Sequence, residues 1–265
     1  MARRALSTAS IGWSSSITFA TLGTAITTLV LVPGLNVLFT VLLGADLAAN
    51  DTVRIGCASA LIATLSSVAA GIVARVATDR WIGVFEYVCT ARPVDAGYWL
   101  GAAAVPALLA SVTGLSNVGI VWLLSLTAPS TGAASGLLIG AIALMPVAVL
   151  GGVCLGIFAA GLGLYLSDPY TGSNVLSIVL PVSAGVIVPV STYPAWLAWV
   201  CSWFPGYRLV QALDTSGSIT SNTAPDLFAL LAADTALAAL YAVIGLGLTF
   251  LAARRIRAGA RASLL

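Results

Sequence analysis

The sequence of 265 residues contains no lysine and no histidine, so arginine supplies all 11 of its basic residues. A phosphate-binding loop of the form GxxxxGK[ST] needs a lysine to reach the phosphates. The chain therefore cannot hydrolyse ATP in the P-loop manner by itself. The absence of histidine also removes the commonest side chain for general-base catalysis and a common metal ligand.

Cysteine is scarce as well, and the few cysteines lie far apart in the sequence. They are Cys57, Cys89, Cys154 and Cys201, with no CxxC pair among them. A zinc site needs a set of cysteine and histidine ligands that this spacing does not supply. We interpret the cysteines as buried thiols, and a disulfide remains the less favoured alternative. We also find no pairing of a nucleophile with a base, and we expect that the chain is not an enzyme.

Charged residues are scarce as well. Only 8% of the residues are charged, the net charge is +2, and 60% of the residues are hydrophobic, with a mean hydropathy of +1.06. Soluble domains are about 45–50% apolar, so the composition predicts a membrane protein. The small net charge, with basic residues at the ends of apolar runs, argues against a nucleic-acid partner.

The apolar runs divide the chain into membrane spans and connecting segments. A span takes about 20 apolar residues, which leaves room for about six spans. We predict an all-α polytopic membrane protein with a single transmembrane domain over residues 1–265. Pro106 interrupts the third span. In the fourth span, Gly152, Gly156 and Gly163 allow close packing against another helix. The predicted spans are residues 21–43, 55–76, 98–126, 136–166, 175–190 and 227–253.

The remaining segments carry the polar and aromatic residues. We expect residues 1–20 to lie in the membrane interface and residues 254–265 to form a basic tail. Residues 191–213 are rich in tryptophan and tyrosine, which is typical of re-entrant or interfacial helices.

Arginine predicts the orientation. If both termini are cytoplasmic, nine of the 11 arginines lie on the cytoplasmic side, and only Arg54 and Arg208 lie outside. This asymmetry follows the positive-inside rule. The arginine-only, alanine-rich composition is typical of a GC-rich bacterial genome, and we predict a multi-pass protein of the bacterial cytoplasmic membrane.

Residues 77–97 gather an unusual share of the charged residues on the predicted cytoplasmic side. Within this segment Trp81, Val84, Phe85 and Val88 would share one side of a helix. The pattern favours a short amphipathic helix between the second and third spans, and a solvated loop is the alternative.

The order of these parts resembles the ABC-2 type permeases over nearly the whole chain. The residues that carry the resemblance are "RxxGxxE" at Arg80, Gly83 and Glu86, "RPV" beginning at Arg92, and the stretch "YPAWLAWVCSWFPGYRLVQAL" before the last span. The family's short helix is typically followed by "TPV" or "SPV", and Pro93 lies one residue farther from the glutamate than in that pattern.

The resemblance implies the membrane subunit of an ATP-binding cassette exporter. Such a subunit pairs with a second permease subunit, as a homodimer or heterodimer, and with two copies of a nucleotide-binding subunit. That partner would bind ATP and Mg, and this chain would bind no cofactor and no metal. The cargo would be amphipathic or apolar, such as a drug, lipid, glycan or peptide.

The resemblance also implies roles for individual residues. The short helix would be a coupling helix seated on the ATPase subunit, and the aromatic helices would close the outer end of the path. The predicted ATPase interface is Arg80, Trp81, Gly83, Val84, Phe85, Glu86 and Arg92, with Trp81 and Phe85 as anchors, and the predicted outer gate is Trp196, Trp199 and Trp203.

Four residues inside or near the spans are open to two interpretations. Asn36, Asn117 and Trp122 would either line a substrate path or serve helix packing. Asp234, inside the last span, would either relay protons or serve a structural role, in which it reaches the outer interface or caps a neighbouring helix. A proton relay would favour the alternative function, a stand-alone transporter or channel without an ATPase partner.

Overall fold

The computed structural model describes residues 6–7, 10–13, 21–46, 51–91, 96–126, 133–216 and 224–262. These residues form helices joined by turns, and no strand occurs among them. The chain is therefore a helical membrane protein, as predicted, with five segments in the described part long and apolar enough to cross a membrane. These segments are Leu22–Asp46, Thr52–Trp81, Gly97–Ser125, Ala134–Gly163 and Pro225–Gly259.

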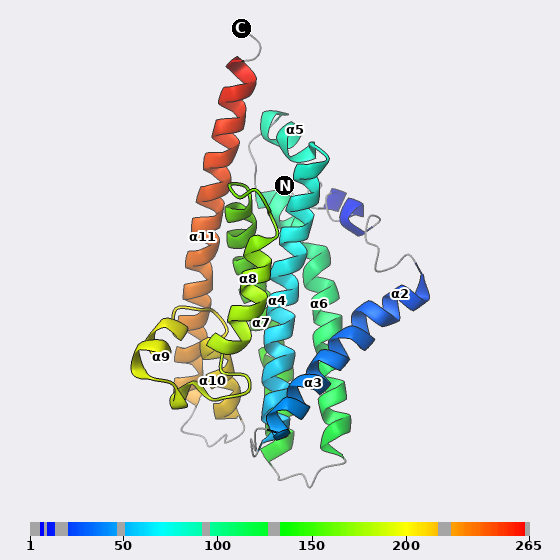
Figure 1. Ribbon diagram of the computed structural model, residues 1–265, viewed down its shortest axis with the longest axis vertical. Helices are drawn as coiled ribbons and strands as arrows, with labels where there is room; N and C mark the ends of the chain where they lie inside the picture. Colours follow the sequence, from blue (N-terminus) through cyan, green and yellow to red (C-terminus); the bar gives the residue numbers. More distant parts are fainter. Residues whose placement is uncertain are drawn as a thin grey trace.

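The first long segment consists of three consecutive helices, α2 (Leu22–Ile26), the π-helix η2 (Thr27–Leu31) and α3 (Val32–Asp46). It is the least buried of the five long segments. Figure 1 shows it running obliquely to α4 (Thr52–Trp81), close to that helix at its α3 end and apart from it at its α2 end.

Helix α4 is the centre of the bundle and packs against α3, α6 (Ala96–Ser125) and α7 (Ala133–Gly163). The contact with α7 depends on glycine. A Cβ atom on Gly152 would lie 2.5 Å from the carbonyl oxygen of Leu65, and one on Gly156 would lie 3.0 Å from the Cα atom of Ala69. The missing side chains let the two backbones approach closely, as the sequence predicted.

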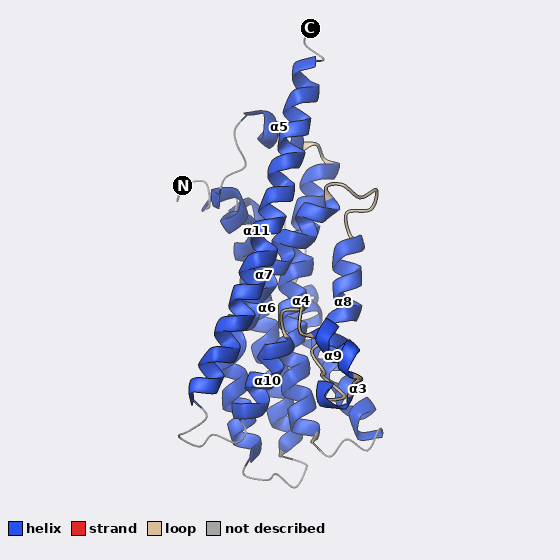
Figure 2. Ribbon diagram, turned by 90° about the vertical axis from the view of Figure 1, so that its left-hand side faces the viewer, coloured by secondary structure: helices blue, strands red, loops and turns tan. Residues whose placement is uncertain are grey.

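Between α7 and the last helix, α11 (Ala224–Ala262), the chain is broken into short pieces. They are α8 (Thr171–Ser183), the 3-10 helix η3 (Val190–Thr192), α9 (Ala195–Cys201) and α10 (Tyr207–Ser216). Figures 1 and 2 show α8 starting toward the end of the molecule where α5 (Val84–Ala91) lies, and α9 and α10 lying toward the opposite end.

The predicted fifth span, residues 175–190, is not one continuous helix. Helix α8 has 13 residues, or about 20 Å at 1.5 Å per residue, against a hydrocarbon thickness of about 30 Å. It ends at Ser183, and Gly185 then adopts a left-handed φ of 69°, which a residue with a side chain rarely takes. The chain thus passes from one end of the bundle toward the other through α8 and the following broken segment.

Candidate functional site

The candidate site is the end of the molecule formed by α5, and its local sequence explains its shape. Helix α4 ends at Trp81, and the turn of Ile82 and Gly83 leads into α5. Gly83 has a φ of 75°, the left-handed conformation that terminates many helices and is accessible to glycine without strain. Ile82 donates its N–H to the Thr78 carbonyl at 3.1 Å. The predicted short helix is therefore present and is turned away from the axis of α4 (Figure 1).

One face of α5 is buried against the bundle. Phe85 is 1% exposed and packs edge-on to Tyr98 of α6, with ring centroids 6.3 Å apart. Cys89 is fully buried, and burial raises the pKa of its thiol, while Arg257 lowers that pKa and Glu86 raises it. Phe85 was expected to anchor the ATPase subunit, but the structure uses it to hold α5 onto this chain.

The other face of α5 and the preceding turn are exposed and mostly apolar. Trp81 is 70% exposed, Ile82 66% and Tyr87 75%, and Val84 and Glu86 are exposed beside them. The Trp81 ring also meets Tyr170 edge-on, at 5.7 Å between centroids. We call Trp81, Ile82, Val84, Glu86 and Tyr87 the α5 surface. Large apolar side chains grouped in this way typically mark an interaction site.

Two arginines hold α5 and its surroundings in place. Arg80 donates from Nη1 to the carbonyl oxygens of Gly163, at 2.8 Å, and Leu166, at 3.0 Å, and so caps the carboxyl end of α7. Arg257 of α11 donates from Nε to the Cys89 carbonyl at 2.7 Å and caps the carboxyl end of α5. Arg80 was predicted to belong to the ATPase interface, and in the structure its guanidinium binds carbonyl groups of this chain. Arg92 lies outside the described residues.

The structure does not bring the three predicted path residues together. Asn36 lines a cavity of about 570 Å³ between α3, α4, α8 and the segment after it, together with Ser59, Ser177 and Tyr193. Asn117 is fully buried in helix packing, and neither its Oδ1 nor its Nδ2 has a hydrogen-bond partner among the described residues. Trp122 is half exposed on the surface of α6. Only Asn36 therefore faces a space that a ligand could occupy.

The predicted gate tryptophans lie together on α9 and the turn after it. Trp196, Trp199 and Trp203 are all exposed, and the rings of Trp199 and Trp203 meet edge-on with centroids 5.9 Å apart. Trp199 and Trp203 line a cavity of about 430 Å³ with Arg208 and residues of α11. Exposed aromatic rings of this kind are stable at a membrane interface.

Asp234 has a structural partner that settles where its side chain points. It is 1% exposed, and its carboxylate accepts the N–H of Gly206, at 3.2 Å to Oδ1 and 3.4 Å to Oδ2. Gly206 has a φ of 99° and immediately precedes α10. Of the two interpretations of Asp234 from the sequence, the cap of a neighbouring helix is the one that the geometry favours, because the carboxylate lies at the amino end of α10.

One tie between distant segments was missed by sequence reasoning. Arg54, at the start of α4, pairs in a bidentate manner with Asp214 of α10, at 2.7 Å from Nε and 3.0 Å from Nη2. Its Nη1 also donates to the carbonyls of Gly185 and Val186, at 3.3 and 3.2 Å. Arg54 thereby fixes the broken segment after α8 to the bundle, and no local pattern signals a partner so far away in the sequence.

Neither the comparison with protein-family models nor the comparison with curated proteins gives a match to this chain. Within the described ranges, no group of histidine, cysteine, aspartate and glutamate residues could hold a metal ion.

Proposed function

We propose that this chain is the membrane subunit of an ABC-2 type exporter, which works with a separate nucleotide-binding subunit. The observation that carries the proposal is the α5 surface, an aromatic and aliphatic patch on a short helix beyond the membrane-spanning segments. Exposed tryptophan and tyrosine side chains are the residue types that most often dominate the binding energy of an interface. A segment that only connected two spans would not need to expose tryptophan and tyrosine side chains.

The attachment of α5 suits the transmission of force. Its connection to α4 is the tight turn at Gly83, its buried Phe85 packs on α6, and Arg257 joins its carboxyl end to α11. A displacement of α5 by the partner would thus reach several long helices at once. ATP and Mg bound by the partner would supply the energy, and the spans would switch between two states as rigid bodies.

The proposed orientation places the α5 surface in the cytoplasm. Arg75 and Arg80 lie in the last turns of α4 before α5, and Arg254, Arg255 and Arg257 lie in the part of α11 near α5. Arg54 and Arg208 belong to the opposite half of the molecule, at the start of α4 and in α10. A cytoplasmic α5 end would therefore satisfy the positive-inside rule. It would also expose α5 to a soluble, ATP-binding partner.

The proposed cargo is amphipathic or apolar. The cavity lined by Asn36 has an apolar lining with a few serine hydroxyls and one tyrosine, and its volume of about 570 Å³ lies within the usual range for small-molecule sites. The cavity lies between α3 and α8, and a second permease subunit, identical or different, would complete a path beside these helices. The alternative of a proton-coupled, stand-alone transporter has less support, because Asp234 acts as a helix cap.

Replacement of Tyr87 by alanine tests the proposal. We expect the chain, purified from native membranes in mild detergent, to retain a soluble subunit that carries a Walker motif. Tyr87→Ala should lower the amount of that subunit at least about tenfold, the factor that corresponds to about 1.4 kcal/mol of lost binding energy. Quantitative mass spectrometry of the purified complex measures this ratio.

Phe228→Ala is the matched control, because Phe228 is 73% exposed, almost as much as Tyr87 at 75%, and lies near the start of α11. It should leave the ratio unchanged. Purification of this chain without any ATPase, repeated across several gentle detergents, would refute the proposed partnership. An equal loss in both variants would refute the role of the α5 surface.

A further inference from the structure

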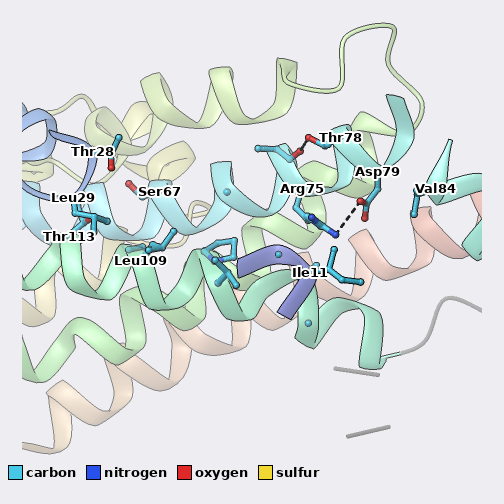
Figure 3. A pocket seen from close by; sticks show the side chains of 18 of the residues that line it. Ile11, Thr28, Leu29, Ser67, Arg75, Thr78, Asp79, Val84, Leu109 and Thr113 are labelled. Carbon is cyan, nitrogen blue, oxygen red and sulfur yellow. Dashed lines mark hydrogen bonds and ion pairs between the residues drawn. The ribbon is translucent and has the colours of Figure 1, made fainter. Parts of the chain in front are cut away.

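A second cavity adjoins the cavity at Asn36, with which it shares the lining residues Pro33 and Ser67, and the proposed transport path does not include it. It has a volume of about 730 Å³ and lies between η2, α4, α6 and the short helical segment at Ile11 and Gly12. Figure 3 shows it extending along α4, from Leu29 and Thr113 at one end to Asp79 and Val84 at the other. Its volume lies within the range of about 300–1,000 Å³ that is typical of ligand sites.

The lining changes character along the length of the cavity. Most of it is apolar, with Leu29, Val105 and Leu109 among the lining residues. The charged groups are confined to the α5 end, where Arg75 and Asp79 lie together (Figure 3). The cavity therefore has one ionic end and an apolar body, which is the complement of an amphiphile.

The ion pair presents its cationic member to the cavity. Arg75 Nη2 lies 3.5 Å from Asp79 Oδ1, and the Tyr98 hydroxyl donates to Asp79 Oδ2 at 3.0 Å. The Asp79 side chain is only 4% exposed, whereas the Arg75 side chain is 19% exposed. Asp79 is thus held by two partners and shielded, and the guanidinium is the group that a ligand reaches first. A guanidinium suits phosphate, because its planar array of N–H groups matches the phosphate oxygens.

The backbone beside the cavity is also unusual. Thr28 and Leu29 belong to η2, and both line the cavity. A π-helical turn is rare and is found frequently at functional sites. Most of the lining residues belong to the three segments Leu22–Asp46, Thr52–Trp81 and Gly97–Ser125, each of which is long and apolar enough to cross a membrane.

We propose that this cavity binds an anionic phospholipid from the membrane leaflet on the α5 side. The headgroup phosphate lies at Arg75, and an acyl chain lies along the apolar lining toward Leu29 and Leu109. A phospholipid is the occupant that fits, because it combines a phosphate with an apolar tail and is present at the depth of these helices. The inference does not rest on the proposed transport function, since a membrane protein of any activity could hold such a lipid.

The test measures lipid binding to the purified, delipidated full chain in detergent. Dioctanoyl phosphatidylglycerol is the probe, and native mass spectrometry counts the bound molecules across a titration. We expect one saturable site in the wild-type chain. Ala74 lines the cavity, so Ala74→Phe should fill it and weaken binding at least about tenfold. Ala70→Phe is the matched control, because Ala70 is exposed one turn earlier on the same helix, and it should bind as the wild type does.

Two further measurements examine the headgroup. Arg75→Gln, checked for folding by circular dichroism and gel filtration, should weaken binding by a similar factor. The uncharged analogue dioctanoylglycerol should bind at least about tenfold more weakly than the phospholipid. Unchanged affinity in Ala74→Phe would overturn the site. Equal binding of dioctanoylglycerol would overturn the role of the phosphate, and equally tight binding of free glycerol phosphate would overturn the assignment to a lipid.

Discussion

At the scale of single residues, some polar side chains within the spans serve defined structural contacts, whereas the buried amide of Asn117 has no hydrogen-bond partner among the described residues. Asp234 is the clearest case, because a carboxylate in an apolar helix is costly unless it has partners. Its acceptance of the Gly206 N–H satisfies a donor at the amino end of α10 and fixes the turn between α9 and α10 to α11. The residue therefore determines where the aromatic segment lies.

Replacement of Asp234 should reveal this role. We expect Asp234→Ala to lower the free energy of unfolding by about 1–3 kcal/mol, the cost of leaving a buried donor without an acceptor. Thermal unfolding in detergent, followed by circular dichroism, measures the change. Asp226→Ala is the control, since Asp226 is exposed in the first turn of α11 and should have little effect. If both variants unfold at the same temperature, Asp234 is not a stabilising cap.

At the scale of elements, α5 is an eight-residue helix, too short to be stable by itself. Its stability comes from tertiary contacts: Phe85 on Tyr98, the buried Cys89, and Arg257 at its carboxyl end. The exposed α5 surface is a consequence, because the face that packs inward fixes which face remains outside. In contrast, Pro106 does not break α6, which continues through it from Ala96 to Ser125, as transmembrane helices often do.

The hold of Arg257 on α5 is measurable through Cys89. In a chain whose other cysteines are replaced by serine, we expect the buried, neutral Cys89 thiol to react slowly with a maleimide. Arg257→Ala should speed labelling about tenfold, because the lost hydrogen bond favours detachment of α5. We expect faster labelling even though Arg257 lowers the thiol pKa, so that its removal disfavours the reactive thiolate. Arg254→Ala, at an exposed position of the same helix, should leave the rate unchanged. Equal rates in both variants would show that the hydrogen bond from Arg257 does not hold α5 in place.

At the scale of the whole molecule, long-range ties connect the broken segment after α8 to the central helix. Arg54 contacts Asp214 and the carbonyls of Gly185 and Val186, so one side chain links α4, α10 and the turn after α8. The Arg54 side chain is 13% exposed and the Asp214 side chain 41% exposed, so solvent screens the ion pair in part, whereas the hydrogen bonds from Nη1 to the two carbonyls are partly buried.

Loss of this tie should loosen one region and spare the other end of the molecule. We expect Arg54→Ala to increase amide hydrogen exchange in residues 184–213 about tenfold or more, while α5 keeps its protection. Hydrogen exchange followed by mass spectrometry measures both regions in one experiment. A uniform increase over the whole chain would instead indicate global destabilisation, and no increase would show that Arg54 is dispensable for the segment.

The sequence by itself determined that this protein lies in a membrane and that it consists largely of long helices. Apolar runs of span length can satisfy their backbone groups in a bilayer as helices, so these runs predicted the long helices. The spacing of Gly152 and Gly156, about one turn apart, predicted the close contact of α7 with another helix. The short helix after the second long helix was also predicted from its amphipathic spacing, but the apolar side that the spacing predicted is divided, because Trp81 and Val84 are exposed and Phe85 is buried.

Only the tertiary structure decided which side chains of that helix point outward. The sequence could not distinguish Phe85, which packs on Tyr98, from Trp81 and Tyr87, which remain exposed, because all three are aromatic and close together. It also could not pair Arg54 with Asp214, break the predicted fifth span after Ser183, or place Arg75 at the end of a cavity. Each of these depends on contacts between segments far apart in the chain, and periodicity and composition carry only local information.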